Sequence, residues 1–118
     1  MRMFTLALAL ALSACAAPPA VQPAEPAAVP ATQSACLAAK GTWGPMGMRG
    51  LPGCSVPYAD AGKTCTDGDQ CLGDCRVVEP DQAMLDKPIT GQCQASSSPF
   101  GCFARVEDSH STGFLCVD

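Results

Sequence analysis

The pattern of hydrophobic positions divides the chain into three parts. Residues 4–12 form one short apolar run that contains a single threonine. Residues 16–34 consist mainly of Ala and Pro, with no glycine and no aromatic residue. In residues 35–118, apolar side chains occur in short groups separated by turn-forming Gly, Pro, Ser and Asp. This third pattern predicts short strands and loops, with little or no helix beyond the apolar run at the start.

The third part contains several local signals. We expect one helical turn at 36–40, with Ser34 as its N-cap and Gly41 as its end. Another single turn is expected between 80 and 85, in the least patterned stretch. The Gly- and Pro-rich stretch 44–53 is expected to be a loop, because this composition excludes a regular helix or a central strand. Strands are expected at 54–58, 92–94, 100–106 and 114–117, the last three as an antiparallel meander.

The first part has the features of an export signal. Arg2 supplies a positive charge, about nine apolar residues follow, and small residues precede Cys15. A membrane-spanning helix needs about 20 apolar residues, so this run is too short to be one. The pattern therefore indicates a segment that is cleaved during export.

The end of this segment reads Leu12-Ser13-Ala14-Cys15, which resembles the lipobox of bacterial lipoproteins. The resemblance implies that residues 1–14 are removed and that Cys15 is acylated, which anchors the chain to a membrane. The residue after the lipidated cysteine is Ala16 and not Asp, and in the lipoprotein family this resemblance implies sorting to the outer membrane. We therefore expect a bacterial envelope protein at the outer membrane, facing the periplasm. The alternative is a soluble secreted protein, cut at an Ala-x-Ala-like site, with a spare Cys15.

The second part is expected to be a spacer. After the lipidated Cys15, the Pro/Ala-rich residues to 34 cannot bury enough apolar surface to offset the entropy of ordering. Proline favours the extended polyproline conformation, so this tether reaches at most roughly 60 Å. The expected organisation is a signal at 1–14, a lipidated tether at 15–34 and a Cys-rich domain at 35–118.

The chain has nine cysteines, and removal of Cys15 leaves an even set that can pair completely. We expect all of the others to form disulfides: Cys36, Cys54, Cys65, Cys71, Cys75, Cys93, Cys102 and Cys116. Because apolar side chains are sparse, cross-links are expected to replace a conventional core. The predicted fold class is a small, disulfide-rich, mainly β domain with short strands and loops.

The pairing of these cysteines stays open, because eight of them allow 105 connectivities. Cys102 and Cys116 are symmetric about position 109, so an antiparallel hairpin centred there would place them opposite each other. Phe103 and Leu115 would then be neighbouring cross-strand partners. In the alternative, the sulfurs of this hairpin connect to the 65–75 region.

Metal and redox sites are the competing uses of clustered cysteines. Only Cys71-x3-Cys75 has a spacing suited to zinc, and His110 is the single histidine. No Cys-x-x-Cys motif indicates a redox centre. Four aspartates lie between 60 and 74, but an EF-hand loop starting at Asp67 would need Gly where Leu72 stands and Glu where Val78 stands. We expect no metal and no cofactor, and take these aspartates as solvated turn carboxylates.

Enzyme and nucleic-acid functions have no motif in the chain. His110 lies in a Ser/Thr-rich stretch and is expected to be solvated, and neither Gly-x-Ser-x-Gly nor a phosphate-binding glycine motif occurs. The formal net charge is −4 and no basic patch is present, which argues against nucleic acid. We therefore expect a non-enzymatic protein.

The loop at 44–53 is the candidate site for a protein partner. It carries four large side chains: Met46, Met48, Arg49 and Leu51. Methionine surfaces adapt to varied partners. The alternatives are that these apolar side chains fold back onto a thin core, or that the Met-x-Met pair binds copper(I).

Two further resemblances involve the Cys-rich domain. Residues 41–43, 60–63, 100–108 and 115–118 resemble segments of uncharacterised Cys-rich bacterial lipoproteins, a family that implies no activity. Residues 111–113 and 116–118 are similar to the end of thyroglobulin type-1 modules, but the Cys-Trp-Cys-Val core of those modules is absent. We expect a lipid-anchored envelope protein that displays its domain for protein–protein interaction. The alternatives are a small protease inhibitor that presents 46–51, or a structural envelope protein without a single partner.

Overall fold

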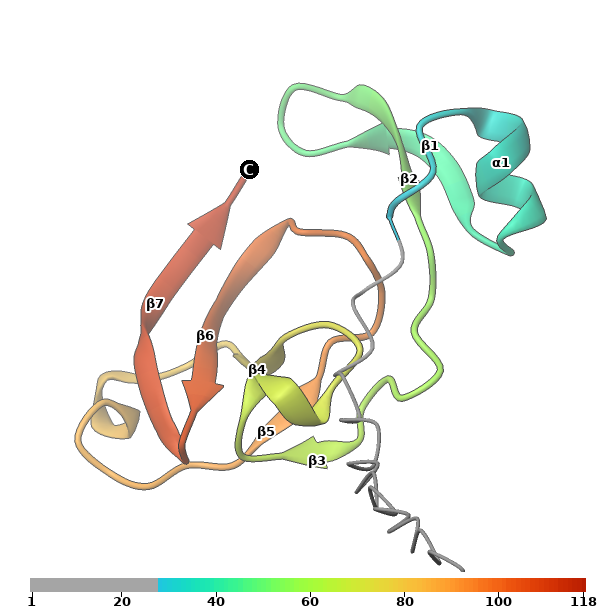
Figure 1. The fold of residues 1–118 in the computed structure, drawn as a ribbon. Helices are drawn as coiled ribbons and strands as arrows, with labels where there is room; N and C mark the ends of the chain where they lie inside the picture. The colour runs from blue at the N-terminus through green and yellow to red at the C-terminus, as the bar shows by residue number, and fades with distance from the viewer. Residues whose placement is uncertain (1–27) are drawn as a thin grey trace, which may run out of the picture.

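The computed structural model describes residues 28–118, which form ten short elements (Figure 1). In chain order these are α1 (Gln33–Ala38), β1 (Thr42–Met46), β2 (Leu51–Ser55), β3 (Thr64–Cys65), η1 (Gly68–Gln70), β4 (Cys75–Val78), η2 (Gln82–Met84), β5 (Gly91–Cys93), β6 (Gly101–Glu107) and β7 (His110–Val117). The predicted fold class, small, disulfide-rich and mainly β, is confirmed. The expected signal segment, Cys15 and the expected tether up to residue 27 lie outside the described residues.

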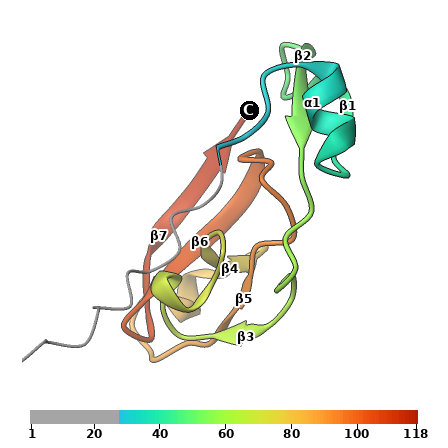
Figure 2. The ribbon, with the colours of Figure 1, turned by 45° about the vertical axis from the view of Figure 1, so that its right-hand side comes forward.

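The strands form two antiparallel sheets. One is the β1–β2 hairpin, and the other has five strands in the order β3-β5-β4-β6-β7. Figures 1 and 2 show α1 and the β1–β2 hairpin together at one end of the five-stranded sheet. The carboxyl end of β7 reaches toward the same end, so the chain terminus lies near the hairpin turn.

Helix α1 begins earlier than expected, and the expectation of Ser34 as its cap is wrong. Thr32 is the N-cap, because its backbone is extended and its Oγ1 accepts a hydrogen bond from the N–H of Ala35 at 3.3 Å. After the helix, Gly41 N–H donates to the carbonyl of Cys36 at 2.8 Å. A side chain at Gly41 would collide with the sulfurs of Cys36 and Cys54, so glycine lets the disulfide hold α1 against β2.

Residues 44–53 are a hairpin and not an irregular loop, so that expectation is wrong. Pro45 and Pro52 face each other across β1 and β2. In an antiparallel pair of strands, every second pair of opposed residues exchanges no backbone hydrogen bonds. Two prolines that face each other at such a position remove no N–H donor that the strand pairing needs. The Gly- and Pro-rich composition excludes a regular helix or a central strand. Both strands of a two-stranded sheet are edge strands, and proline is tolerated there.

The final three strands do not form a meander, because β4 lies between β5 and β6. Arg76 and Val78, on β4, stand opposite Arg105 and Phe103 of β6. The expected strand at 92–94 is displaced by one residue to Gly91–Cys93. The single turn expected between 80 and 85 is confirmed as η2.

The β6–β7 hairpin closes with a two-residue turn, Asp108-Ser109, and not with the longer turn expected from the sequence. Both residues have positive φ, 49° and 64°, as in the turn type whose twist suits a hairpin. Beyond the turn, one residue of β6 faces two of β7, Thr112 and Gly113, which is a β-bulge. The bulge shifts the register by one residue and brings Cys116 opposite Cys102.

Disulfides make up most of the core. The four pairs are Cys36–Cys54, Cys65–Cys75, Cys71–Cys93 and Cys102–Cys116. The last pair, and the opposition of Phe103 and Leu115 beside it, match the register expected from the sequence. Cys65, Cys75 and Cys93 are buried with Val106 in one cluster beneath the sheet. No polar residue is buried as a whole among the described residues, so sulfur and a few apolar groups fill most of the interior.

Candidate functional site

The candidate partner residues lie around the turn of the β1–β2 hairpin. Met48 and Arg49 occupy the two central positions of a turn that closes when Gly50 N–H donates to the carbonyl of Gly47 at 3.1 Å. Met48 is 81% exposed and Leu51 is 56% exposed, whereas Met46 is half-buried. Gly47 and Gly50 both have φ near +60°, a conformation that lets the turn form without strain. We call Met46, Met48, Arg49 and Leu51 the hairpin tip.

The hairpin tip is held against the end of the five-stranded sheet. A shallow groove of about 210 Å³ is lined by Met46, Arg49 and Leu51 together with Phe100 and Asp118. Gly47 lies directly on the ring of Phe100, because a Cβ there would be 2.6 Å from a ring carbon. The tip is therefore braced by Phe100 in addition to the Cys36–Cys54 disulfide.

Sequence reasoning missed Phe100 and Asp118 as parts of this groove. Each is about fifty or more positions from Gly47 in the chain, and only the folded arrangement brings them together. The two methionines also differ in environment. The Met46 sulfur lies over Gly53, where a Cβ would be 2.7 Å away, whereas Met48 projects from the exposed turn.

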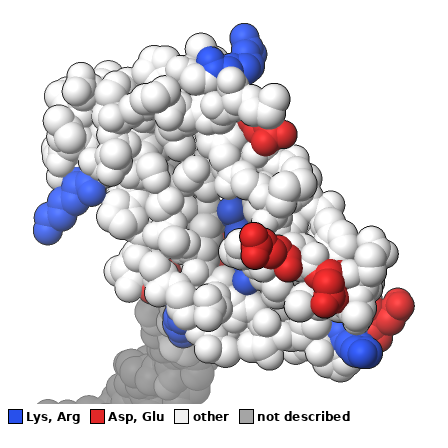
Figure 3. Space-filling model, turned by 180° about the vertical axis from the view of Figure 1, so that it is seen from behind, with Lys and Arg blue, Asp and Glu red and all other residues white. Residues whose placement is uncertain are grey.

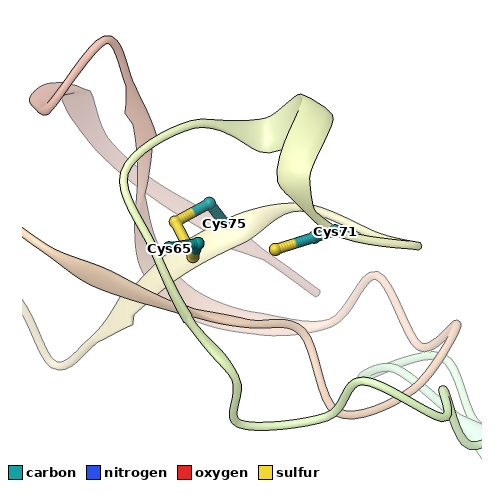
Figure 4. Close-up of side chains that lie close together, drawn as sticks. All are labelled: Cys65, Cys71 and Cys75. Atoms are coloured by element: carbon teal, nitrogen blue, oxygen red, sulfur yellow. A yellow bond between two sulfur atoms is a disulfide. The ribbon is translucent and has the colours of Figure 1, made fainter. Parts of the chain in front are cut away.

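Two disulfides lie next to each other under the η1 loop. Figure 4 shows the sulfur of Cys71 pointing toward the Cys65–Cys75 bridge. The Sγ atoms of Cys65, Cys71 and Cys75 lie within 4.8 Å of one another. Cys65 and Cys75 are 2% and 1% exposed, whereas Cys71 is partly exposed. Cys71 borders a cleft, here called the polar cleft, whose lining includes Asp60, Asp69, Asp74, Arg76 and Arg105.

That polar cleft is organised by charges from several segments. Asp74 accepts hydrogen bonds from Arg76 at 2.7 Å and from Arg105 at 3.3 Å. The guanidinium of Arg76 also stacks on Phe103, 3.6 Å from the ring centroid. The ion pairs and the stacking fix the end of the loop that enters β4.

Three of the four aspartates are partly exposed turn carboxylates, as expected, but they also accept hydrogen bonds from neighbouring segments. Besides Asp74, Asp60 accepts from the N–H of Leu72 at 2.8 Å. Asp67 caps η1 by accepting from Asp69 N–H at 3.0 Å and also accepts from Asp108 N–H at 2.9 Å. These carboxylates tie turns together, which is a structural role that the spacing did not reveal.

The two carboxyl groups at η1 influence each other. Hydrogen bonds from the backbone of Asp69 and Asp108 lower the pKa of Asp67. A hydrogen bond with Asp67 and the negative charge of Asp67 raise the pKa of Asp69. At neutral pH, ionised Asp69 therefore opposes folding, while ionised Asp67 favours it.

We predict that Asp69→Asn slightly raises the melting temperature at pH 7. The gain disappears as the pH falls through the raised pKa of Asp69, because the wild-type group is then protonated as well. The stabilising effect of Asp67 is present above its unfolded-state pKa and is lost as the pH falls through its lowered pKa. Asp67→Asn should therefore lower the melting temperature at pH 7. Thermal melts at pH 7 and pH 3 check both signs, and a loss of stability in Asp69→Asn at pH 7 would contradict the assignment.

On the one face of residues 28–118 that Figure 3 draws, charge is not concentrated. On the face in Figure 3, acidic and basic side chains are interspersed, and most of the area carries neither. His110 is exposed at the start of β7, and its Nδ1 is 2.8 Å from the carbonyl of Asp108. Within residues 28–118, no helix has the length and apolar character needed to cross a bilayer.

Comparison with known proteins found no counterpart. No protein-family description, no curated protein and no solved structure matches the chain.

Proposed function

We propose that this protein is a lipid-anchored component of the bacterial envelope that binds another protein through its hairpin tip. In this proposal the domain has no enzymatic activity, and disulfides present a rigid surface. The observation that carries the proposal is the placement of Met48, an 81% exposed large apolar side chain, on a braced turn. Apolar side chains that are exposed next to one another mark interaction sites, and Leu51 at the same hairpin turn is 56% exposed.

The rigidity of the tip supports binding on energetic grounds. Association costs free energy for each side chain and loop that must be ordered. Here the backbone is already fixed by the turn, by Cys36–Cys54 and by the Phe100 ring. The unbranched Met48 side chain can still adapt to its partner, and Arg49 beside it can form an ion pair or stack on an aromatic ring.

We predict that Met48→Ser combined with Leu51→Ser greatly weakens binding to an envelope partner, with about a tenfold or greater loss of affinity. A photo-crosslinker placed at Arg49 of the full-length protein would identify the partner in cells, and binding would then be measured with the purified pair. The matched control is Val78→Ser on β4, because Val78 is apolar and 74% exposed but belongs to the five-stranded sheet and not to the β1–β2 hairpin. Equal loss of binding in both variants would contradict a role specific to the tip.

The membrane anchor is a separate part of the proposal. The lipobox resemblance at 12–15 motivates acylation of Cys15, attachment to the outer membrane and a location facing the periplasm. We predict that Cys15→Ser abolishes incorporation of labelled fatty acid and blocks removal of residues 1–14. Intact-mass analysis and membrane fractionation check this. A Cys15→Ser protein that matures to the wild-type polypeptide mass and stays in the membrane fraction would contradict it.

A protease inhibitor is the second candidate, because the tip is an exposed turn braced at its base, a form that can enter a protease cleft. Arg49 at the turn would select proteases that cleave after basic residues. Incubation with a panel of serine and cysteine proteases separates the two functions. Inhibition that is lost in Arg49→Ala but kept in Lys40→Ala would favour the inhibitor, whereas binding without inhibition favours the adaptor role.

A further inference from the structure

The starting observation is a carboxylate oxygen that has no partner. Asp60 uses its Oδ2 to accept a hydrogen bond from Leu72 N–H at 2.8 Å. Its Oδ1 is buried and has no hydrogen-bond partner among the described residues. A buried acceptor without a partner is destabilising, so its retention needs an explanation.

The carboxylate of Asp60 lies beside a disulfide. A carboxylate oxygen of Asp60 and the Sγ atoms of Cys71 and Cys93 lie within 4.8 Å of one another. We propose that opening of the Cys71–Cys93 disulfide converts these three residues into a zinc-binding site. The proposal is independent of the hairpin tip and of the membrane anchor.

The donor set suits zinc. Zinc binds thiolate sulfur at about 2.3 Å and carboxylate oxygen at about 2.0–2.2 Å, in a tetrahedral arrangement. In that geometry two sulfurs are about 3.8 Å apart, which rotation about the side-chain bonds of the two cysteines provides. Thiolate ligands disfavour magnesium and calcium. The fourth position would face the polar cleft that Cys71 and Asp60 border, where a water molecule can occupy it.

Accessibility determines which bridges a reductant opens. Cys102 and Cys116 are exposed on the β6–β7 hairpin, so their bridge is expected to open first. Of the Cys65–Cys75 and Cys71–Cys93 disulfides, only Cys71 is partly exposed, because Cys65, Cys75 and Cys93 are almost fully buried. Cys71–Cys93 is therefore expected to open second, while Cys65–Cys75 still holds β3 to β4.

In vitro a phosphine can supply the two electrons, with a water molecule giving its oxygen to the phosphine and its protons to the two thiols. The corresponding biological reductant is a dithiol. One of its thiolates attacks Cys71 Sγ, which forms a mixed disulfide and releases Cys93 as a thiolate. The second thiol of the reductant then attacks the mixed disulfide, which releases Cys71 and closes the reductant's own disulfide. Two electrons pass to the protein, and the two thiol protons leave when Zn²⁺ binds Cys71, Cys93 and the ionised Asp60.

The experiment uses the full-length protein under graded reduction by a phosphine in the absence of oxygen. Alkylation and peptide mapping record which cysteines are free at each stage, and Zn²⁺ is titrated against a chromophoric chelator. We expect no tight zinc binding when only Cys102 and Cys116 are free, and one Zn²⁺ per chain once Cys71 and Cys93 are also free. Co²⁺ in place of Zn²⁺ should give the absorption of a tetrahedral site with two thiolates.

The decisive variant is Asp60→Asn, since the amide oxygen can still accept from Leu72 N–H and keep the loop in place. Loss of a group that only orients a metal ligand already costs about 10–100-fold in affinity, so loss of this ligand should lower zinc affinity at least about tenfold. Asp69→Asn is the matched control, because it makes the same chemical change at the same cleft and should leave affinity unchanged. Equal affinity in wild type and Asp60→Asn would overturn the proposal. So would the absence of binding after Cys71 and Cys93 are free, or binding that requires free Cys65 and Cys75.

Discussion

Gly91→Val is expected to prevent the domain from folding. Gly91 is buried on β5, where a Cβ would be 2.9 Å from the backbone oxygen of Arg76 and 2.9 Å from Cys75 Sγ. The same Cβ would be 3.0 Å from Val106. None of these neighbours can move easily, because the first is backbone and the second belongs to the Cys65–Cys75 disulfide. The two additional methyl groups of valine would therefore force β5 away from β4.

The magnitude of this effect is large compared with the stability of a small domain. Overpacking in a core commonly costs about 1–3 kcal/mol, and the cost rises when the backbone must move. Whole domains have only about 5–15 kcal/mol of stability. Circular dichroism melts and disulfide mapping should show loss of the cooperative transition and scrambled cysteine pairs.

Gly44→Val is the matched control for this prediction. Gly44 also lies in a strand, but no atom is within 4 Å of a Cβ built there. Valine favours extended backbone, so Gly44→Val should fold with unchanged disulfides and no loss of stability. A Gly91→Val protein that melts like wild type would show that β5 is not packed as described.

The fold class was predictable because the composition restricts it strongly. Many cysteines and few large apolar residues leave a disulfide-stapled domain as the main solution, and this is what the structure shows. The position of β4 was not predictable, because Arg76-Val77-Val78 is short and followed directly by turn residues. Its central place depends on long-range pairing with β6 and on the stacking of Arg76 on Phe103.

The Cys102–Cys116 pairing was predicted correctly, but with an incomplete reason. A two-residue turn at Asp108-Ser109 without a bulge would place Leu115 opposite Cys102. The extra residue at Thr112-Gly113 restores the expected opposition. The local sequence suggested the symmetry but could not reveal the bulge, since Gly113 is equally consistent with a longer turn.

The hairpin tip illustrates which parts of a site can be found from sequence. Its four residues were found because large side chains are unusual in a Gly- and Pro-rich stretch. Phe100 and Asp118 were missed because only the folded chain brings them to the groove that Gly47 and Arg49 also line. Asp60 was noticed only as one acid among several, and its unpartnered oxygen is visible only in the folded state.

Replacement of Cys65 and Cys75 together by alanine should be more damaging than removal of the Cys102–Cys116 bridge. If only chain entropy is considered, the Cys65–Cys75 and Cys102–Cys116 bridges stabilise the folded state by nearly equal amounts. Their sequence separations are 10 and 14 residues, which correspond to about 2.7 and about 3.0 kcal/mol. Chain entropy therefore gives the Cys102–Cys116 bridge a slightly larger stabilising effect than the Cys65–Cys75 bridge.

Burial reverses that order. The sulfurs of Cys65 and Cys75 lie in the cluster with Cys93 and Val106, so alanine at both sites leaves a cavity in addition to the freed loop. Cys102 and Cys116 are exposed, and the β6–β7 strands already hold them opposite each other. We expect the Cys65→Ala/Cys75→Ala variant to lose about 4–5 kcal/mol of unfolding free energy and to be largely unfolded at 37 °C. Cys102→Ala/Cys116→Ala should lose about 2–3 kcal/mol and keep a cooperative melt. Urea unfolding of both double variants measures these losses and decides between the entropy account and the burial account. An equal or larger loss of unfolding free energy for the Cys102–Cys116 pair would mean that chain entropy, and not the packed sulfur cluster, governs the stability of the domain.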